Sequence, residues 1–297
     1  MKNCFVAIIG RANAGKSTLL NTILGEKIAI TSDKAGTTRN AIIGIYNDED
    51  SQIVFTDTPG IVRSSTALGD FMYNEAHNQI EANDLILYLF DSSRRFDQED
   101  EQIVSDLFKE NDQVFLVLTK IDLISKERLI KLITYLSQKY PFREIVPLSA
   151  KNKENIDELI KTIKDNCMEG PRFYSPDEIT NLSLDFRIRE IIREKILNLF
   201  YQEVPHQIAV VIEQYKETEK RVYIDATIIV GRSNHKAIII GKSGNSLKRI
   251  NMESSREISE LTGKKAMLSL YVKVDEQWFD KEHKIAQYGY DLKMQNE

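Results

Sequence analysis

The chain has 297 residues, which is longer than one typical domain and suits two domains that each bury a core. Hydrophobic residues make up 42% of it and charged residues 29%, the proportions of an ordinary soluble globular protein. The net charge of −5 argues weakly against a nucleic-acid partner, and no apolar run approaches the roughly 20 residues that span a bilayer.

The N-terminus and the cysteines favour a cytoplasmic protein. A strand is expected almost at the first residue, which leaves no room for a secretory signal. Cys4 and Cys167 are the two cysteines of the chain and lack the spacing of a metal site, so we expect free thiols in a reducing cytosol. The four histidines are scattered and predict no metal cluster.

The first part of the chain alternates short β-rich runs with longer helical patterns. This alternation predicts an α/β domain with a mixed, mostly parallel sheet and helices on both faces. The polar turn at 47–51 joins two strands without a helix and predicts one antiparallel hairpin. We expect strands at 4–9, 41–46, 52–56, 85–90, 113–118 and 144–148, and helices at 16–24, 67–81, 97–110, 126–139 and 154–166.

The pattern changes after the helix breakers Gly170-Pro171 and Ser175-Pro176, which indicate a linker. The second part predicts the order α-β-β-α-α-β. Its expected elements are a helix at 181–201, strands at 207–214 and 221–230, helices at 236–240 and 244–261, and a strand at 266–274. We therefore expect one domain at 1–168, a linker at 169–180 and a second domain at 181–297.

Residues 10–17 read Gly-Arg-Ala-Asn-Ala-Gly-Lys-Ser and match the phosphate-loop pattern G-x-x-x-x-G-K-[ST]. They follow an expected strand and precede an expected helix, so the backbone N–H groups would converge on phosphate oxygens at a helix N-terminus. Lys16 would reach the β- and γ-phosphates, and the Ser17 hydroxyl would bind Mg²⁺. The expected nucleotide contacts in this loop are Gly10, Arg11, Ala12, Asn13, Ala14, Gly15, Lys16 and Ser17.

A second signal, Asp57-Thr58-Pro59-Gly60 followed by Ile61, closes the expected strand at 52–56. Asp57 at this place can hold Mg²⁺ through water. Gly60 lacks a side chain, so its N–H can approach the γ-phosphate. We include Thr58, Pro59 and Ile61 among the nucleotide-site residues.

Two further signals point to guanine. Thr119-Lys120-Ile121-Asp122 ends the strand at 113–118, and the Asp122 carboxylate can accept from the paired N–H donors of guanine, which adenine lacks. Lys120 would lay its stem over the base. Ser149-Ala150-Lys151 ends the next strand, where the Ala150 N–H can donate to guanine O6.

Residues 34–39, Lys-Ala-Gly-Thr-Thr-Arg, form a loop that we interpret as a switch. We expect Thr38 to contact Mg²⁺ and the γ-phosphate only when a nucleoside triphosphate is bound. Thr37 is the alternative residue for this role. The expected catalytic residues are Lys16, Thr38 and Gly60, and the expected Mg²⁺ ligands are Ser17, Thr38 and Asp57.

Charge is distributed unevenly along the chain. Residues 232–273 hold nine Lys and Arg against three Glu, a net charge of +6, so the rest of the chain carries −11. This segment contains Gly241-Lys242-Ser243-Gly244, a G-x-x-G loop between two expected helices that would let a nucleic-acid backbone approach closely. A solvated charged face and a plain helix–helix turn are the alternatives. The expected RNA contacts are Gly241, Lys242, Ser243, Gly244, Lys248 and Arg249.

The four nucleotide signals together resemble the translation-factor-like GTPases, in the branch with G-x-P-N-V-G-K-S loops. Ala12 and Ala14 replace the usual Pro and Val of that branch. Ile61 stands where Ras-like enzymes place a glutamine that orients the attacking water. Similar loops with an Asn imply that Asn13 helps to bind a monovalent cation, K⁺, in place of an arginine finger; a plain tight-turn role for Asn13 stays equally open.

The second part resembles a type II KH domain with its core at about 201–279, and the whole chain resembles the Era family of bacterial ribosome-assembly GTPases. Segments 169–171, 189–195, 203–206 and 272–274, together with Trp278, carry the whole-chain resemblance. It implies GTP hydrolysis with Mg²⁺, and binding to the 30S subunit and to 16S rRNA near its 3′ end. It also implies a cytoplasmic monomer with peripheral association at the inner face of the cell membrane, for which the sequence itself has no lipidation site or basic amphipathic helix.

Three other functions are compared with a GTP-hydrolysing switch. An RNA-binding assembly factor whose nucleotide is mainly structural is the alternative. A P-loop ATPase or kinase is disfavoured by the signals at 119–122 and 149–151, and a tandem GTPase with a KH-like end is excluded by the single phosphate loop.

Overall fold

The computed structural model describes residues 1–61, 65–201 and 204–290. Glu203 and residues 291–297, which belong to the expected second domain, lie outside the described residues. The chain divides into two compact units, and the boundary between Asn181 and Leu182 separates the sheet of the first from the sheet of the second. Each unit is described by itself below.

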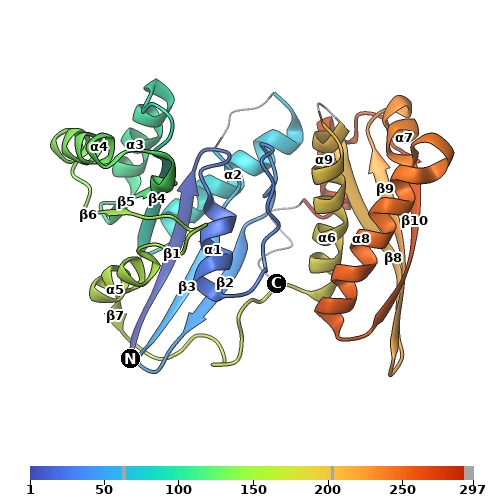
Figure 1. The fold of residues 1–297 in the computed structure, drawn as a ribbon, viewed down its shortest axis with the longest axis horizontal. Helices are drawn as coiled ribbons and strands as arrows, with labels where there is room; N and C mark the ends of the chain where they lie inside the picture. The colour runs from blue at the N-terminus through green and yellow to red at the C-terminus, as the bar shows by residue number, and fades with distance from the viewer. Residues whose placement is uncertain (62–64, 202–203, 291–297) are drawn as a thin grey trace. The chain divides into compact units, whose positions relative to one another are not determined.

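The first unit is a seven-stranded sheet with helices on both faces (Figure 1). The strands follow the order β2-β3-β1-β4-β5-β6, and β7 pairs with β1. Pairing is parallel except in the β2–β3 hairpin and between β1 and β7. The strands are β1 (Lys2–Gly10), β2 (Ile42–Asn47), β3 (Ser51–Asp57), β4 (Leu85–Asp91), β5 (Val114–Thr119), β6 (Glu144–Pro147) and β7 (Met168–Glu169).

The central strands β1, β4 and β5 are buried because their side chains alternate between two covered faces. On one face Ala7, Ile9 and Tyr88 pack with Ile103 of α3 and Leu136 of α4. The helices are α1 (Lys16–Leu24), α2 (Ala67–Ala82), α3 (Gln98–Glu110), α4 (Lys126–Lys139) and α5 (Ile156–Asn166), with a short 3₁₀ helix at Ile121–Leu123. The predicted mixed, mostly parallel sheet and its one hairpin are confirmed.

The two cysteines correct a prediction. We expected free thiols, but Cys4 and Cys167 form a disulfide with their Cα atoms 5.2 Å apart. The cause is the antiparallel pair of β1 and β7, in which Asn3 lies opposite Met168. Continuing that register by one residue places Cys4 opposite Cys167. Sequence spacing could not reveal this pairing, because β7 has only two residues and depends on β1 for its existence.

The segment expected as a linker lies along the edge of the first unit. The Ile45 N–H donates to the Ile179 carbonyl at 2.8 Å, which adds a backbone hydrogen bond to the outer edge of β2. The Gln52 side chain accepts from the N–H groups of Phe173 and Tyr174 at 2.7 and 3.0 Å. These contacts hold residues 173–179 on the sheet.

The second unit is a three-stranded sheet, ordered β10-β9-β8, with helices on one face. β9 pairs with β10 in parallel and with β8 in antiparallel fashion. Isoleucines of α6 and α8, among them Ile192 and Ile258, pack on Ile224 and Ile228 of β9. The elements are α6 (Leu184–Leu199), β8 (Ile208–Glu217), β9 (Arg221–Val230), α7 (Ser233–Ile240), α8 (Asn245–Thr262), β10 (Lys265–Val274) and α9 (Glu282–Gln287), with 3₁₀ helices at Val204–Gln207, Lys242–Gly244 and Trp278–Asp280.

This order confirms the predicted α-β-β-α-α-β arrangement, with α9 as an addition that the sequence analysis did not expect. Over the described ranges, the helices are all too short or too polar to cross a membrane.

Candidate functional site

The phosphate loop at 10–17 connects β1 to α1 at the carboxyl end of the sheet. Gly10 has to be a glycine because a Cβ there would lie 2.6 Å from the Leu89 carbonyl oxygen. Gly15 has φ of 95° and begins α1 without a side-chain cap, so the first N–H groups of the helix face the loop. The first N–H groups of a helix have no partner within the helix, so this end of α1 suits an anion.

Lys16 is buried beneath this loop. Its Nζ donates to the carbonyls of Gly10 and Arg11, each at 3.0 Å. Burial lowers the pKa of Lys16 to about 8, and the nearby Asp57 carboxylate opposes that shift. The loop carbonyls hold the ammonium in place at the base of the phosphate loop.

The three expected Mg²⁺ ligands come together beside Lys16. The Ser17 hydroxyl donates to Asp57 Oδ2 at 2.6 Å and lies 2.9 Å from Thr38 Oγ1. Asp57 Oδ1 is buried and has no hydrogen-bond partner among the described residues, and burial raises the pKa of Asp57 to about 6 against the attraction of Lys16. Two hydroxyls and a carboxylate with an open oxygen suit Mg²⁺, which prefers oxygen ligands.

The two threonines of the switch loop differ in their contacts. Thr38 Oγ1 lies 3.5 Å from Asp57 Oδ2, inside the oxygen cluster. The Thr37 hydroxyl donates to the Lys34 carbonyl at 2.6 Å, within its own loop. The geometry therefore favours Thr38 over Thr37 as the residue that senses the ligand.

The segment after Asp57 packs against the phosphate loop. A Cβ on Gly60 would lie 2.9 Å from the Ala12 nitrogen, so only glycine fits this close approach. The Ile61 N–H donates to the Gly10 carbonyl at 3.2 Å, and the Thr58 hydroxyl donates to the Ile8 carbonyl at 2.8 Å. Pro59 and Gly60 lie between these two hydrogen-bonded residues. The Ile61 side chain packs on the apolar core under α2 and α3.

The signals expected to read the base are linked by hydrogen bonds at neighbouring strand ends. Asp122 Oδ1 accepts from the Ser149 hydroxyl at 2.6 Å, which orients its carboxylate. Thr119 Oγ1 donates to the Ala14 carbonyl at 2.8 Å and so ties β5 to the phosphate loop. Lys120 has a left-handed φ of 55° and forms an ion pair with Asp91 at 2.7 Å.

The remaining base-site residues lie beside these. Ile121 begins the short 3₁₀ helix after β5. The Ala150 carbonyl accepts from the Thr22 hydroxyl of α1 at 3.3 Å, and Lys151 is exposed. Residues of the phosphate loop, the switch loop, Gly60 and Lys120 line one common pocket.

The Arg11 side chain makes contacts that the sequence analysis did not predict. Its guanidinium bonds Asp97 at 2.8 Å and also contacts Glu99 and the fully buried Asp100. Asp97 caps α3 and Asp100 completes the capping box. The Arg11 side chain thus fastens the phosphate loop to α3, and any contact with a nucleotide would come from its backbone. A capping box is visible in a sequence, but its partner across the sheet is not.

Asn13 lies at a left-handed position with φ of 62°. Its Nδ2 donates to the Asp33 carbonyl at 2.7 Å, which connects the phosphate loop to the start of the switch loop. Asn13 therefore both forms the tight turn of the phosphate loop and contacts the segment before the switch loop.

The G-x-x-G loop joins α7 to α8 in the second unit. Gly241 and Gly244 have φ of 73° and 76°, and a Cβ on Gly241 would meet Ser246 Oγ at 2.3 Å. Lys242 and Ser243 between them are exposed. On α8, Lys248 is exposed, whereas Arg249 forms an ion pair with Glu253 at 2.7 Å. The loop offers close backbone approach with two cations nearby.

Two protein families match separate parts of the chain. Residues 5–120 match the family described as 50S ribosome-binding GTPase, and residues 203–279 match the KH domain family.

Two solved structures are similar to this chain along almost its whole length. One is a variant of Era from Aquifex aeolicus bound to GDP and AlF₄⁻, with 39% identity and a TM-score of 0.95. The other is Era in complex with MgGDPNP and nucleotides 1506–1542 of 16S ribosomal RNA, with 40% identity and a TM-score of 0.95. Each comparison covers 98% of this chain and 100% of the other.

Proposed function

The chain belongs to the Era family of GTPases, and from this membership we propose that it is a GTP-driven switch that binds 16S rRNA near its 3′ end. We further propose that it acts on the 30S subunit during small-subunit assembly. The observation that carries the proposal is the convergence of Ser17, Thr38 and Asp57 beside the buried Lys16 in a chain that also carries a KH domain.

GTP hydrolysis to GDP and phosphate would use the residues around this cluster. Lys16 offsets charge that develops on the β- and γ-phosphate oxygens, and its burial strengthens that interaction. Gly60 brings a backbone N–H toward the γ-phosphate, which its packing on Ala12 supports. Thr38 contacts Mg²⁺ and the γ-phosphate only when the γ-phosphate is present, so the conformation of its loop depends on whether GTP or GDP is bound.

Mg²⁺ fits the oxygen cluster, and Ser17, Thr38 and Asp57 would hold it directly or through water. When bound, the ion neutralises charge on the β- and γ-phosphate oxygens. Asp57 Oδ1, buried and without a partner in the described structure, supports this assignment because such an atom ordinarily finds a ligand.

Guanine would be selected by Asp122 and Ala150. The hydrogen bond from Ser149 fixes the Asp122 carboxylate, so that its other oxygen can accept from the base. Adenine presents no matching pair of donors to a carboxylate, which would then remain unpaired.

A group other than Ile61, the residue after Gly60, must orient the attacking water. Ile61 has no polar atom in its side chain, and that side chain packs on the apolar core. We propose that Asn13 helps to bind K⁺ beside the phosphates, where the cation supplies positive charge. Asn13 and Asp33, which are joined by the Asn13 hydrogen bond, both line the pocket, and this supports a role for Asn13 beside the phosphates.

RNA would bind to the second unit at 241–244. The two positive-φ glycines allow the RNA backbone to come close, and Lys242, Lys248 and Arg249 supply positive charge. We propose domain limits of 1–168 and 181–297, with residues 169–180 between them.

We also propose that the chain acts as a monomer in the cytoplasm, with peripheral contact to the inner face of the cell membrane. A single chain provides both the nucleotide site and the RNA loop, which supports the monomer.

The experiment that tests this function is multiple-turnover GTP hydrolysis with and without purified small subunits. A switch used as a timer turns over repeatedly and changes its rate when subunits are present. A protein whose nucleotide is mainly structural would hold one nucleotide through many cycles of RNA binding, at a rate that subunits do not alter.

A further inference from the structure

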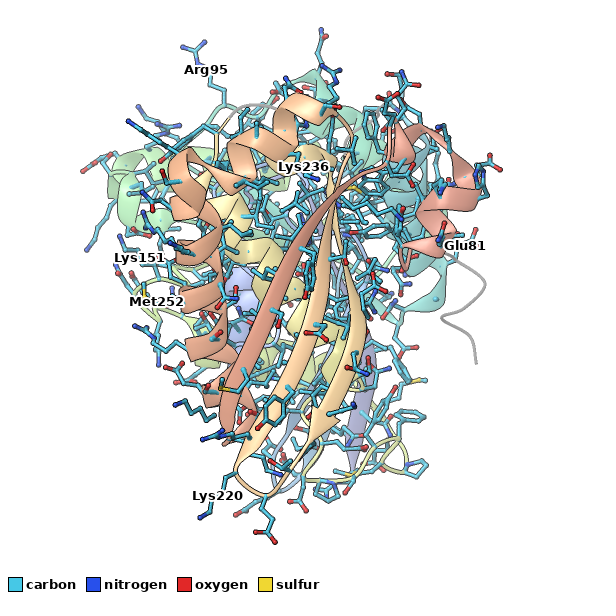
Figure 2. The ribbon with its side chains drawn as sticks, turned by 90° about the vertical axis from the view of Figure 1, so that its right-hand side faces the viewer. Glu81, Arg95, Lys151, Lys220, Lys236 and Met252 are labelled. Atoms are coloured by element: carbon cyan, nitrogen blue, oxygen red, sulfur yellow. A yellow bond between two sulfur atoms is a disulfide. The ribbon has the colours of Figure 1, made fainter. Side chains whose placement is uncertain are left out.

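One face of the three-stranded sheet of the second unit, called the open face below, is exposed toward the β8–β9 hairpin, whereas Thr227 and Ile229 farther along β9 on the same face are buried. Figure 2 looks onto this sheet, with the β8–β9 hairpin at Lys220 at its lower end. The helices α6 and α8 pack on the other face, where Ile224 and Ile228 are buried. The G-x-x-G loop belongs to that helical layer, so the open face is a separate surface.

The pairing register of the strands places three large side chains on the open face. Tyr223 of β9 lies opposite Met267 of β10, and Lys216 of β8 lies opposite Tyr223 from the other side. Tyr271 is four residues beyond Met267 on the same strand and so points to the same face. Tyr223 and Met267 are each 41% exposed, and Tyr271 is 60% exposed. Tyr223 and Met267 are cross-strand neighbours, and exposed groups of this kind are typical of interaction sites.

The same face carries unpaired positive charge. Lys216, Arg221, Lys265 and Lys273 occupy its register positions, and none of the four forms an ion pair with a described residue. Asp225, opposite Ser269, is the one acid among the paired positions of this face that the structure describes. These paired positions therefore have a net charge of +3, without the exposed Glu213 at the bulge of β8, although the whole chain carries −5.

We propose that this face is a second RNA-binding surface, on which bases stack against Tyr223 and Tyr271 while the surrounding cations contact phosphates. Aromatic side chains interleaved with lysines are typical of surfaces that bind single strands. The inference rests on the proposed RNA function of the chain.

The length of the RNA supports two surfaces. The Era complex cited above contains nucleotides 1506–1542, which are 37 nucleotides. A G-x-x-G loop clamps only about four nucleotides. An RNA of that length bound through the loop has many nucleotides left to bind elsewhere, and the open face has the charge and the aromatic groups to hold some of them.

The test measures the dissociation constants of the full-length protein for two RNAs. One is the 37-nucleotide segment, and the other is a probe of about ten nucleotides from its 3′ end, long enough for a G-x-x-G loop. Tyr271→Ala should weaken binding of the long RNA about tenfold, the effect of losing one base stack, and leave the short probe unchanged. Tyr271→Phe should keep the wild-type affinity because it keeps the ring. Tyr135→Ala, at an exposed tyrosine on α4 of the first unit, is the matched control.

A loop variant separates this inference from the proposed function. Lys242→Asp with Ser243→Asp places acids on the exposed loop and should weaken both RNAs. If that variant weakens both and Tyr271→Ala changes neither, the second surface is overturned and the RNA function stands. If the loop variant also changes neither, the RNA function itself fails. If Tyr271→Ala weakened binding of both RNAs equally, the face would belong to the same binding site as the G-x-x-G loop. If it weakened binding of the small subunit but of neither RNA, the face would bind a protein. Either result overturns the proposal.

Discussion

Gly60→Ala tests how closely the segment after Asp57 must approach the phosphate loop. The added Cβ would lie 2.9 Å from the Ala12 nitrogen and 3.0 Å from its Cα, whereas ordinary contacts of a Cβ begin at 3.4 Å. Both neighbours are backbone atoms and cannot rotate away. The two segments must therefore separate by about 0.5 to 1 Å.

A displacement of this size moves the Gly60 N–H away from the γ-phosphate. Misplacement by about 1 Å costs on the order of 100-fold in rate, so we expect kcat for GTP to fall about 100-fold. GDP lacks the γ-phosphate, and its affinity should change little.

The assay is steady-state GTP hydrolysis together with GDP affinity and a thermal melt. Gly25→Ala is the matched control: Gly25 ends α1 at φ of 70° with nothing within 4 Å of a Cβ, so this change should cost about 1 kcal/mol of stability and keep kcat. Wild-type kcat in Gly60→Ala would refute the argument that this contact positions the γ-phosphate.

Three further predictions concern the base, the cation and a buried acid. Asp122→Ala should abolish the preference for GTP over ATP in a competition assay, and a preference that persists would refute the assignment to guanine. Hydrolysis should be faster in K⁺ than in Na⁺ buffer, and Asn13→Ala should remove the difference; equal wild-type rates in both buffers would contradict the cation role. Burial raises the pKa of Glu75 above its ordinary 4.5, so its ionised form opposes folding at pH 7. Glu75→Gln keeps an acceptor for the Ala41 N–H and should raise the melting temperature at pH 7. The gain should become smaller as the pH is lowered, because a growing fraction of wild-type Glu75 is then protonated in the fold; a gain that does not shrink would show another cause.

Most of the fold could be predicted because its elements have strong periodicity or clear ends. The helix at 126–139 and the strand at 221–230 have the expected bounds. The elements that were missed are short: β7 has two residues and α9 has six. Such segments carry too little pattern of their own, and their form depends on the neighbours they pair with. The Cys4–Cys167 disulfide was missed for the same reason.

The nucleotide site could be proposed from the sequence because its four motifs follow strand ends in a fixed order. The sequence left Thr37 and Thr38 open, and only the distances to Asp57 favour Thr38. It could not show that the Arg11 side chain bonds Asp97, because that contact joins residues 86 positions apart. The functional roles of these residues stay predictions until the variants above are measured.

The central claim is that GTP controls RNA binding, and crosslinking tests it most directly. The purified full-length protein is crosslinked to total RNA with GTP or with GDP, and the recovered RNA is sequenced. We predict enrichment of the 3′ end of 16S rRNA with GTP alone. The same enrichment with GDP, or enrichment of unrelated RNA with both nucleotides, would contradict the claim.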